Sequence, residues 1–133
     1  MDAALRALVS QRAGGRCEYC RMRQEHLPLA LQLEHIIAKQ HGGTDEADNL
    51  AMGCDRCNAF KGPNLSGIDP ESGEIVTLFN PRTQLWQEHF TSDEARIAGL
   101  TPVGRATVRV LNMNAPRRIR LRMALLERGE WNP

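Results

Sequence analysis

A carboxylate, a histidine and two amides in the first half of the chain are of types that could together hydrolyse a phosphodiester. Glu34 and His35 are adjacent, and Asn49 and Asn58 follow. A histidine can take a proton from water near neutral pH. A carboxylate oxygen and an amide oxygen suit a hard divalent cation such as Mg2+ or Mn2+. The sequence therefore indicates His35 as a general base, Glu34 and Asn58 as ligands of a catalytic metal, and Asn49 as the residue that holds the connecting loop.

Four cysteines form two Cys-x-x-Cys pairs, Cys17 with Cys20 and Cys54 with Cys57. Two such pairs complete a tetrahedral zinc site of four thiolates, which leaves no position open for substrate. In a reducing compartment this pattern favours metal ligands over disulfides. We therefore expect one structural Zn2+. The free energy that zinc binding contributes to folding suits a chain of 133 residues in which aromatic residues make up only 5%, because such a chain has a small core.

Two strands and a helix must position these groups. Residues 29–33 alternate in polarity and predict a short strand that delivers Glu34 and His35. Residues 55–61 predict a short helix that ends at Gly62-Pro63. Adjacent residues of a regular strand point to opposite faces, so Glu34 and His35 can share one site only if the strand ends or bends there, or if substrate reaches around its edge.

The flanking segments have their own signals. Apolar spacing predicts an amphipathic helix over residues 2–12, ended by Gly14-Gly15. Thr101-Pro102 predicts a helix start. Asn114 is expected to cap a last helix that carries Ile119, Met123 and Leu126 inward. After Pro63 we expect a turn at 69–73, strands at 74–78, 86–90 and 95–100 with a turn at 92–93, and helices at 101–111 and from about 116 to 129.

The order of motifs resembles one known family. Cys-x-x-Cys, Glu-His-Ile, Gly-Gly, Asn-Leu and Cys-x-x-Cys-Asn-x-x-Lys, found between Arg16 and Lys61, are similar to the HNH endonucleases. The resemblance implies a ββα-metal core, here braced by a four-cysteine zinc knuckle. It also implies that His35 is the general base, that Glu34 and Asn58 bind the catalytic metal, that Asn49 orients the site, and that Lys61 meets the phosphate backbone.

Two positions depart from the usual pattern of that family. Ala38 stands where proline is common, and Asn58 stands where many members have histidine, although asparagine is a known variant. Asn49 also has a purely structural interpretation as a turn residue. His41 is interpreted as a loop residue with a possible phosphate contact, and His89 as a core residue beside Trp86.

The net charge of +1 gives no argument for a nucleic acid, but its distribution does. Seven arginines and the single acid Glu127 lie between Arg105 and Arg128. Such a bias suits a polyanionic partner, and a solubilising helix face is the alternative. The candidate DNA-contacting residues are Lys61, Arg56, Arg105, Arg109, Arg117 and Arg118.

These signals predict one α+β domain over residues 1–133. Residues 1–62 would form a helix and the zinc-braced core, and residues 63–133 a β-hairpin region with C-terminal Arg-rich helices. No run of 18 apolar residues and no signal-peptide pattern exist, so no membrane association and a cytoplasmic location are expected.

The expected function is metal-dependent cleavage of double-stranded DNA, with nicking as the activity of a monomer. The resemblance implies 5′-phosphate and 3′-hydroxyl products. An inactive zinc-stabilised nucleic-acid-binding module and a protein-interaction scaffold are the alternatives. A homodimer or another protein partner stays open.

Overall fold

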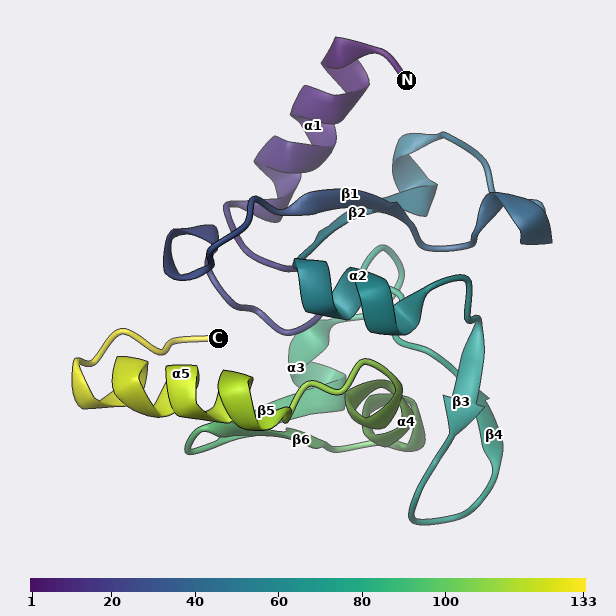
Figure 1. Cartoon of the computed structure of the whole chain (residues 1–133). Helices are drawn as coiled ribbons and strands as arrows, with labels where there is room; N and C mark the ends of the chain where they lie inside the picture. Colours follow the sequence, from purple (N-terminus) through teal and green to yellow (C-terminus); the bar gives the residue numbers. More distant parts are fainter.

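A computed structural model describes the whole chain, Met1 to Pro133, and shows an α+β fold of short helices and three separate antiparallel hairpins (Figure 1). Strand β1, Gln32–His35, pairs with β2, Leu50–Gly53, with Glu34 opposite Ala51. Helix α2, Asp55–Lys61, follows β2 directly. The predicted ββα unit is therefore present. Its first strand begins three residues later than expected and includes both Glu34 and His35.

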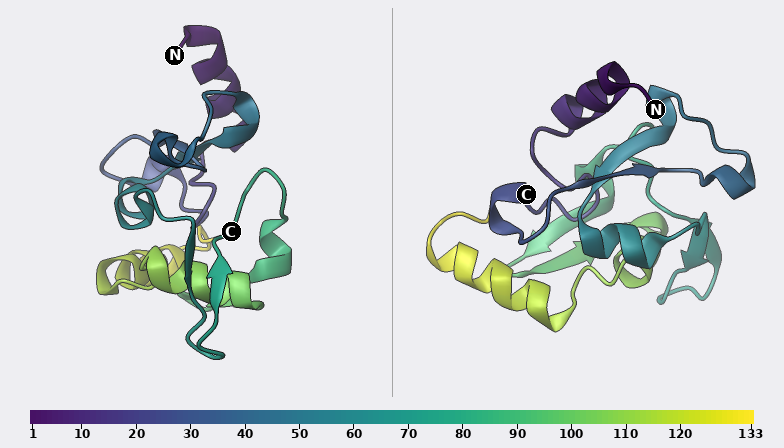
Figure 2. Two further views of the ribbon diagram at one scale, coloured as in Figure 1. Left: turned by 90° about the vertical axis from the view of Figure 1, so that its right-hand side faces the viewer. Right: turned by 45° about the horizontal axis from the view of Figure 1, so that its top comes forward.

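Helix α1, Ala3–Ala13, confirms the predicted N-terminal helix and packs over the β1–β2 hairpin (Figure 2). The Asp2 side chain accepts a hydrogen bond from Leu5 N and so caps its first turn. Gly14 ends it in the left-handed conformation that glycine adopts without strain. The Arg12 guanidinium donates to Leu50 O at 2.7 Å and fastens the helix to the start of β2.

The second half of the chain lies on the side of α2 opposite β1 (Figures 1 and 2). This half contains two hairpins, β3 (Ser66–Ile68) with β4 (Ile75–Thr77) and β5 (Phe90–Asp93) with β6 (Arg96–Gly99). It also contains the helices α3 (Trp86–His89), α4 (Pro102–Val110) and α5 (Pro116–Glu127). One cluster of 16 buried residues runs from the cysteines through Phe79 and Trp86 to Leu125. The zinc-knuckle cysteines are thus part of the core.

The prediction of a strand over 86–90 is wrong, because residues 86–89 form helix α3. A helical turn brings Trp86 and Phe90 to the same side, where their rings stack with centroids 5.2 Å apart. The Trp86 indole donates to Tyr19 O at 2.7 Å, a buried bond that fixes this turn against the knuckle. The hairpin turn consequently shifts to Glu94 and Ala95.

The inward face predicted for the last helix is also wrong. Arg118, Arg122 and Leu125 point inward, whereas Met123 is 52% exposed and Leu126 39% exposed. Arg122 is buried because the main chain solvates it: its guanidinium donates to Ala95 O at 2.5 Å and to Met113 O at 2.8 Å.

Of the two helix caps predicted in the C-terminal half, the structure contains one. Asn114 does not cap α5, since its amide instead bonds the backbone N–H and C=O of Ile97. The predicted cap at Thr101 is confirmed, with Thr101 Oγ1 accepting from Gly104 N at 3.0 Å.

Candidate active site

Glu34, His35 and Asn58 line one hollow of about 330 Å3 at the end of β1 and the C-terminal part of α2. Strand β1 has no second neighbour, so its outer edge is open. The outer edge of β2 is occupied instead, because Glu18 N of the knuckle donates to Met52 O at 2.9 Å. Two adjacent strand residues reach the same hollow because β1 ends at His35 and its free edge forms part of the wall. This geometry answers the question of opposite faces raised by the sequence.

Glu34 is buried in an internal network. Tyr19 Oη donates to Glu34 Oε1, and the Lys61 ammonium lies 3.2 Å from Glu34 Oε2. Burial raises the pKa of Glu34, and the Lys61 charge opposes this effect. Burial and the Glu34 carboxylate raise the pKa of Tyr19, so its hydroxyl stays protonated and can donate. Tyr19 lies between two cysteines of the knuckle, and sequence reasoning did not identify it.

Lys61 was predicted to meet the phosphate backbone, but the structure places its side chain inside the protein. It is 2% exposed, and its ammonium donates to Ile36 O at 2.8 Å in addition to its contact with Glu34. Lys61 comes from the last turn of α2 and Glu34 from β1, so this ion pair ties the helix to the strand. The amphipathic spacing of α2 is the signal from which this inward position could have been predicted.

Asn49 fastens the loop that joins β1 to β2. Its side chain accepts from Ile37 N at 2.9 Å and donates to Ile37 O at 3.0 Å and to Thr44 O at 2.8 Å. Gly43 passes close by, and a Cβ there would lie 1.7 Å from Ile37 O, so only glycine fits. Asn49 therefore lies outside the hollow and shapes the loop beside it.

His35 and Asn58 each have a polar partner. His35 Nε2 lies 2.7 Å from Asp45 Oδ1. Asn58 Nδ2 donates to Gln32 Oε1 at 2.6 Å, which leaves Asn58 Oδ1 free to accept or to bind a cation. Neither Asp45 nor Gln32 was identified from the sequence, because both partnerships depend on loop and strand geometry.

The four cysteine sulfurs lie within 4.8 Å of one another and are buried. Four ligands on one tetrahedral zinc would be about 3.8 Å apart, and the sulfurs of Cys20 and Cys54 are separated by 3.8 Å. Backbone N–H groups of Cys20 and Cys57 point at the sulfurs of Cys17 and Cys54, each at 3.4 Å. Burial raises the pKa of the Cys17 thiol, so ionised sulfurs here need a cation. The predicted four-cysteine cluster is thus present and fits a structural zinc.

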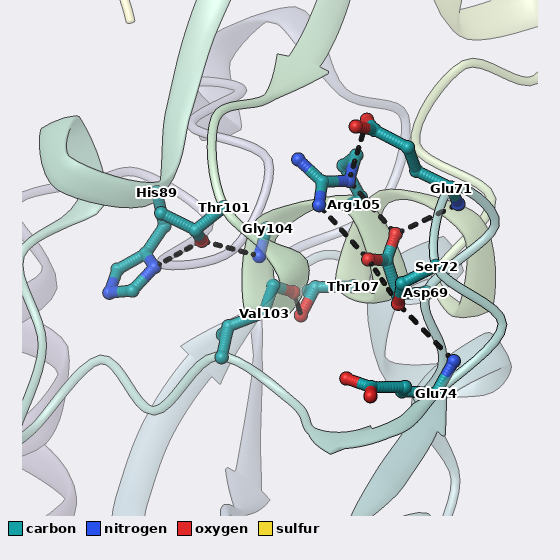
Figure 3. Close-up of polar contacts among 10 residues, drawn as sticks. All are labelled: Asp69, Glu71, Ser72, Glu74, His89, Thr101, Val103, Gly104, Arg105 and Thr107. Carbon is teal, nitrogen blue, oxygen red and sulfur yellow. Dashed lines mark hydrogen bonds and ion pairs between the residues drawn. The ribbon is translucent and has the colours of Figure 1, made fainter.

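The predicted arginine contacts have varied placements, none of them in the wall of the hollow. Arg105 holds Asp69 with two hydrogen bonds of 2.8 and 2.9 Å (Figure 3). Arg118 pairs with Asp55 at 3.1 Å. The others lie on helix surfaces: Arg56 over the ring of Phe60, and Arg109 and Arg117 exposed on α4 and α5.

Two cationic side chains near His35 were not predicted. Lys39 lines the hollow, and Arg6 of α1 lines a neighbouring hollow of about 580 Å3 that shares Leu33 and His35 with the first. The remaining histidines occupy ordinary positions. His89 Nδ1 shares a hydrogen bond of 2.7 Å with Thr101 Oγ1 (Figure 3). The His89 ring also packs on Phe79, and His41 is exposed in the loop.

The fold and the cluster together define a ββα unit braced by four cysteines. The HNH endonuclease family model matches residues 17–63, the segment that holds all four cysteines, Glu34, His35, Asn49 and Asn58. Over this segment, which is less than half of the chain, the protein is similar to the HNH endonucleases. No curated protein and no solved structure gave a significant match. No helix is both long enough and apolar enough to cross a membrane.

Proposed function

We propose that this protein is a divalent-metal-dependent endonuclease that hydrolyses DNA phosphodiester bonds. The observation that carries the proposal is the common hollow lined by Glu34, His35 and Asn58. These are the three groups that the reaction needs, and a purely structural module would have no use for them together. The HNH family match covers the same residues.

The donor set in the hollow fits a hard cation. Asn58 has a free amide oxygen, and Glu34 has about four lone-pair positions of which Tyr19 and Lys61 use two. A carboxylate and an amide oxygen, with positions left to water and phosphate, suit Mg2+ or Mn2+. Such an ion would neutralise charge on the phosphate and on the leaving oxygen. Because Lys61 already satisfies part of the charge of Glu34, we expect weak binding that is completed by the substrate phosphate.

The side chains would divide the reaction between them. His35 takes a proton from water, and the water oxygen forms a bond to phosphorus. The bond from phosphorus to the 3′ oxygen breaks, and that oxygen takes a proton from solvent. The products are a 5′-phosphate and a 3′-hydroxyl. One hollow serves one strand, so the monomer would nick duplex DNA.

The DNA strand would lie along the open edge of β1, because both hollows meet there and share His35. Arg6 on one side and Lys39 on the other would contact phosphates. The exposed Arg109 and Arg117 lie on the far helices and would add only long-range attraction. Arg56, Arg105 and Arg118, with partners within the chain, are expected to contribute less.

The test is incubation of supercoiled plasmid with the zinc-loaded protein in Mg2+, in Mn2+ or in EDTA. Nicking should require the added metal and should be lost in His35→Ala and Asn58→Ala. His26→Ala is the matched control, since that imidazole lines neither hollow and its loss should leave nicking unchanged. Absence of metal-dependent nicking, or equal nicking by His35→Ala, would favour the inactive DNA-binding module. Metal analysis should find one zinc per chain in every variant.

A further inference from the structure

The imidazole of His35 has a carboxylate partner that no motif contains. Asp45 Oδ1 lies 2.7 Å from His35 Nε2, and the other carboxylate oxygen lies 2.9 Å from the Lys39 ammonium. The hydrogen bond from His35 and that from Lys39 hold the pKa of Asp45 below its usual range, so the carboxylate is ionised. An ionised carboxylate can only accept a hydrogen bond, so His35 Nε2 must be the donor.

The position of Asp45 is set by the backbone on both sides of it. Asn49 Nδ2 holds Thr44 O at 2.8 Å, and Asn49 N donates to Glu46 O at 2.9 Å. Thr44 Oγ1 accepts from Glu46 N across the residue between them. Asn49 is buried, and it also ties this segment to Ile37, two residues beyond His35. The carboxylate is therefore presented to His35 by a fastened loop, although its own side chain is half exposed.

We infer that Asp45 is a positioning residue that fixes the tautomer and the ring orientation of His35. With the proton on Nε2, the lone pair is on Nδ1, and Nδ1 is the atom that would take the proton from water. Asp45 would not touch substrate and would not receive that proton; its charge would stabilise the imidazolium that forms. This inference rests on the proposed nuclease function, and it assigns to the 36–48 loop a role beyond connecting two strands.

The same contact has an opposite interpretation, which the experiment must separate. A carboxylate bound to His35 could hold the imidazole away from water and so restrain the enzyme. A positioning carboxylate and a restraining one predict rate changes of opposite sign when the carboxylate is removed. Asp48 supplies a matched control, because it is an exposed acid of the same loop without a hydrogen bond or ion pair to His35.

The experiment compares Asp45→Ala, Asp45→Asn, Asp48→Asn and His35→Ala with the unchanged protein in single-turnover cleavage of a labelled duplex. For Asp45→Ala we expect the rate constant to fall about tenfold or more, but less than for His35→Ala, since a general base is worth roughly 10²–10⁴-fold. The DNA concentration at half-maximal rate should stay unchanged. Asp45→Asn should be intermediate, because its amide oxygen still accepts from Nε2–H. Asp48→Asn should stay within about twofold of the unchanged protein.

Nitrogen-15 NMR of the His35 ring supplies a readout that does not depend on cleavage. The neutral ring should carry its proton on Nε2 in the unchanged protein and show a mixture of tautomers in Asp45→Ala. Cleavage by Asp45→Ala at the normal or a faster rate, or an unchanged tautomer, would overturn the inference about Asp45 while leaving the nuclease function in place. An unchanged protein that cleaves nothing would overturn the proposed function, and the inference with it.

Discussion

Replacing Lys61 by methionine should destabilise the domain far more than the same replacement at Lys39. The Lys61 ammonium is 2% exposed and faces Glu34 at 3.2 Å, Ile36 O at 2.8 Å and His35 O at 3.3 Å. Methionine can fill the space of the lysine stem but supplies no donor. The buried Glu34 carboxylate would keep only the Tyr19 hydroxyl.

The expected size follows from the burial of both charges. Removing one partner of a buried ion pair costs about 3–5 kcal/mol, because the other charge stays buried without compensation. For a domain of this size that corresponds to a loss of roughly 10–20 °C in Tm. Lys39 pairs with Asp45 at 2.9 Å, but its side chain is 64% exposed, so Lys39→Met should cost less than about 1 kcal/mol.

The measurement is urea denaturation with zinc held at one concentration, because bound metal contributes to the apparent stability. Lys61→Met removes the strongest influence that lowers the pKa of Glu34, so that pKa should rise further above its usual value. An acid with a raised pKa in the folded state loses stability as pH rises through that pKa. The deficit of Lys61→Met should therefore be larger at pH 8 than at pH 5.

A double variant completes this test. Glu34→Gln in the Lys61→Met background removes the uncompensated charge and should recover part of the loss. If Lys61→Met and Lys39→Met proved equally stable, or if the deficit did not depend on pH, the argument for a buried Glu34–Lys61 pair would fail.

Three further predictions concern single contacts. Tyr19→Phe removes the hydroxyl donor of Glu34 and should raise the Mg2+ concentration for half-maximal nicking by roughly 10-fold or more, with zinc content unchanged; an unchanged Mg2+ requirement would refute a role of Tyr19 in placing Glu34. Arg105 lowers the pKa of Asp69 below its ordinary value of 3.8. The stability that Asp69 supplies is therefore present above that value and is lost as pH falls below it. The difference in Tm between the unchanged protein and Asp69→Asn should shrink below pH 4, and a constant difference would contradict this. Arg122→Met leaves two buried carbonyls without their donor, so it should lower the free energy of unfolding in urea by about 3 kcal/mol. The control Arg120→Met, at an exposed position, should lower it by less than about 0.5 kcal/mol. Equal losses would refute a structural role for Arg122.

The elements around the site could be predicted because local signals and motif spacing agree there. The Cys-x-x-Cys pairs, the helix over 55–61 and its Gly62-Pro63 end have causes within a few residues, and all three are present in the structure. The helix started by Thr101-Pro102 is of the same kind. Where a turn or cap depends on its own residues, the sequence is sufficient.

The errors fall where distant contacts decide the local structure. Trp86 and Phe90 are aromatic residues that suit a strand, yet a hydrogen bond from Trp86 to Tyr19 and stacking on Phe90 accompany a helical turn. In α5 a pattern of apolar residues suggested one inward face, but the carbonyls of Ala95 and Met113 solvate Arg122 and rotate the other face inward. The apolar spacing of α5 carries no information about these acceptors, which lie in the β5–β6 turn and in the segment between α4 and α5.

The cysteine cluster and the hollow are better described as one unit than as a scaffold with a separate site. Tyr19, between two of the cysteines, reaches Glu34, and Glu18 beside it occupies the outer edge of β2, so the edge of β1 is the one that stays open to a substrate. The knuckle therefore decides both which strand edge stays open and how the Glu34 carboxylate is held. Loss of zinc should then impair cleavage through Glu34 even in molecules whose C-terminal hairpins and helices remain folded.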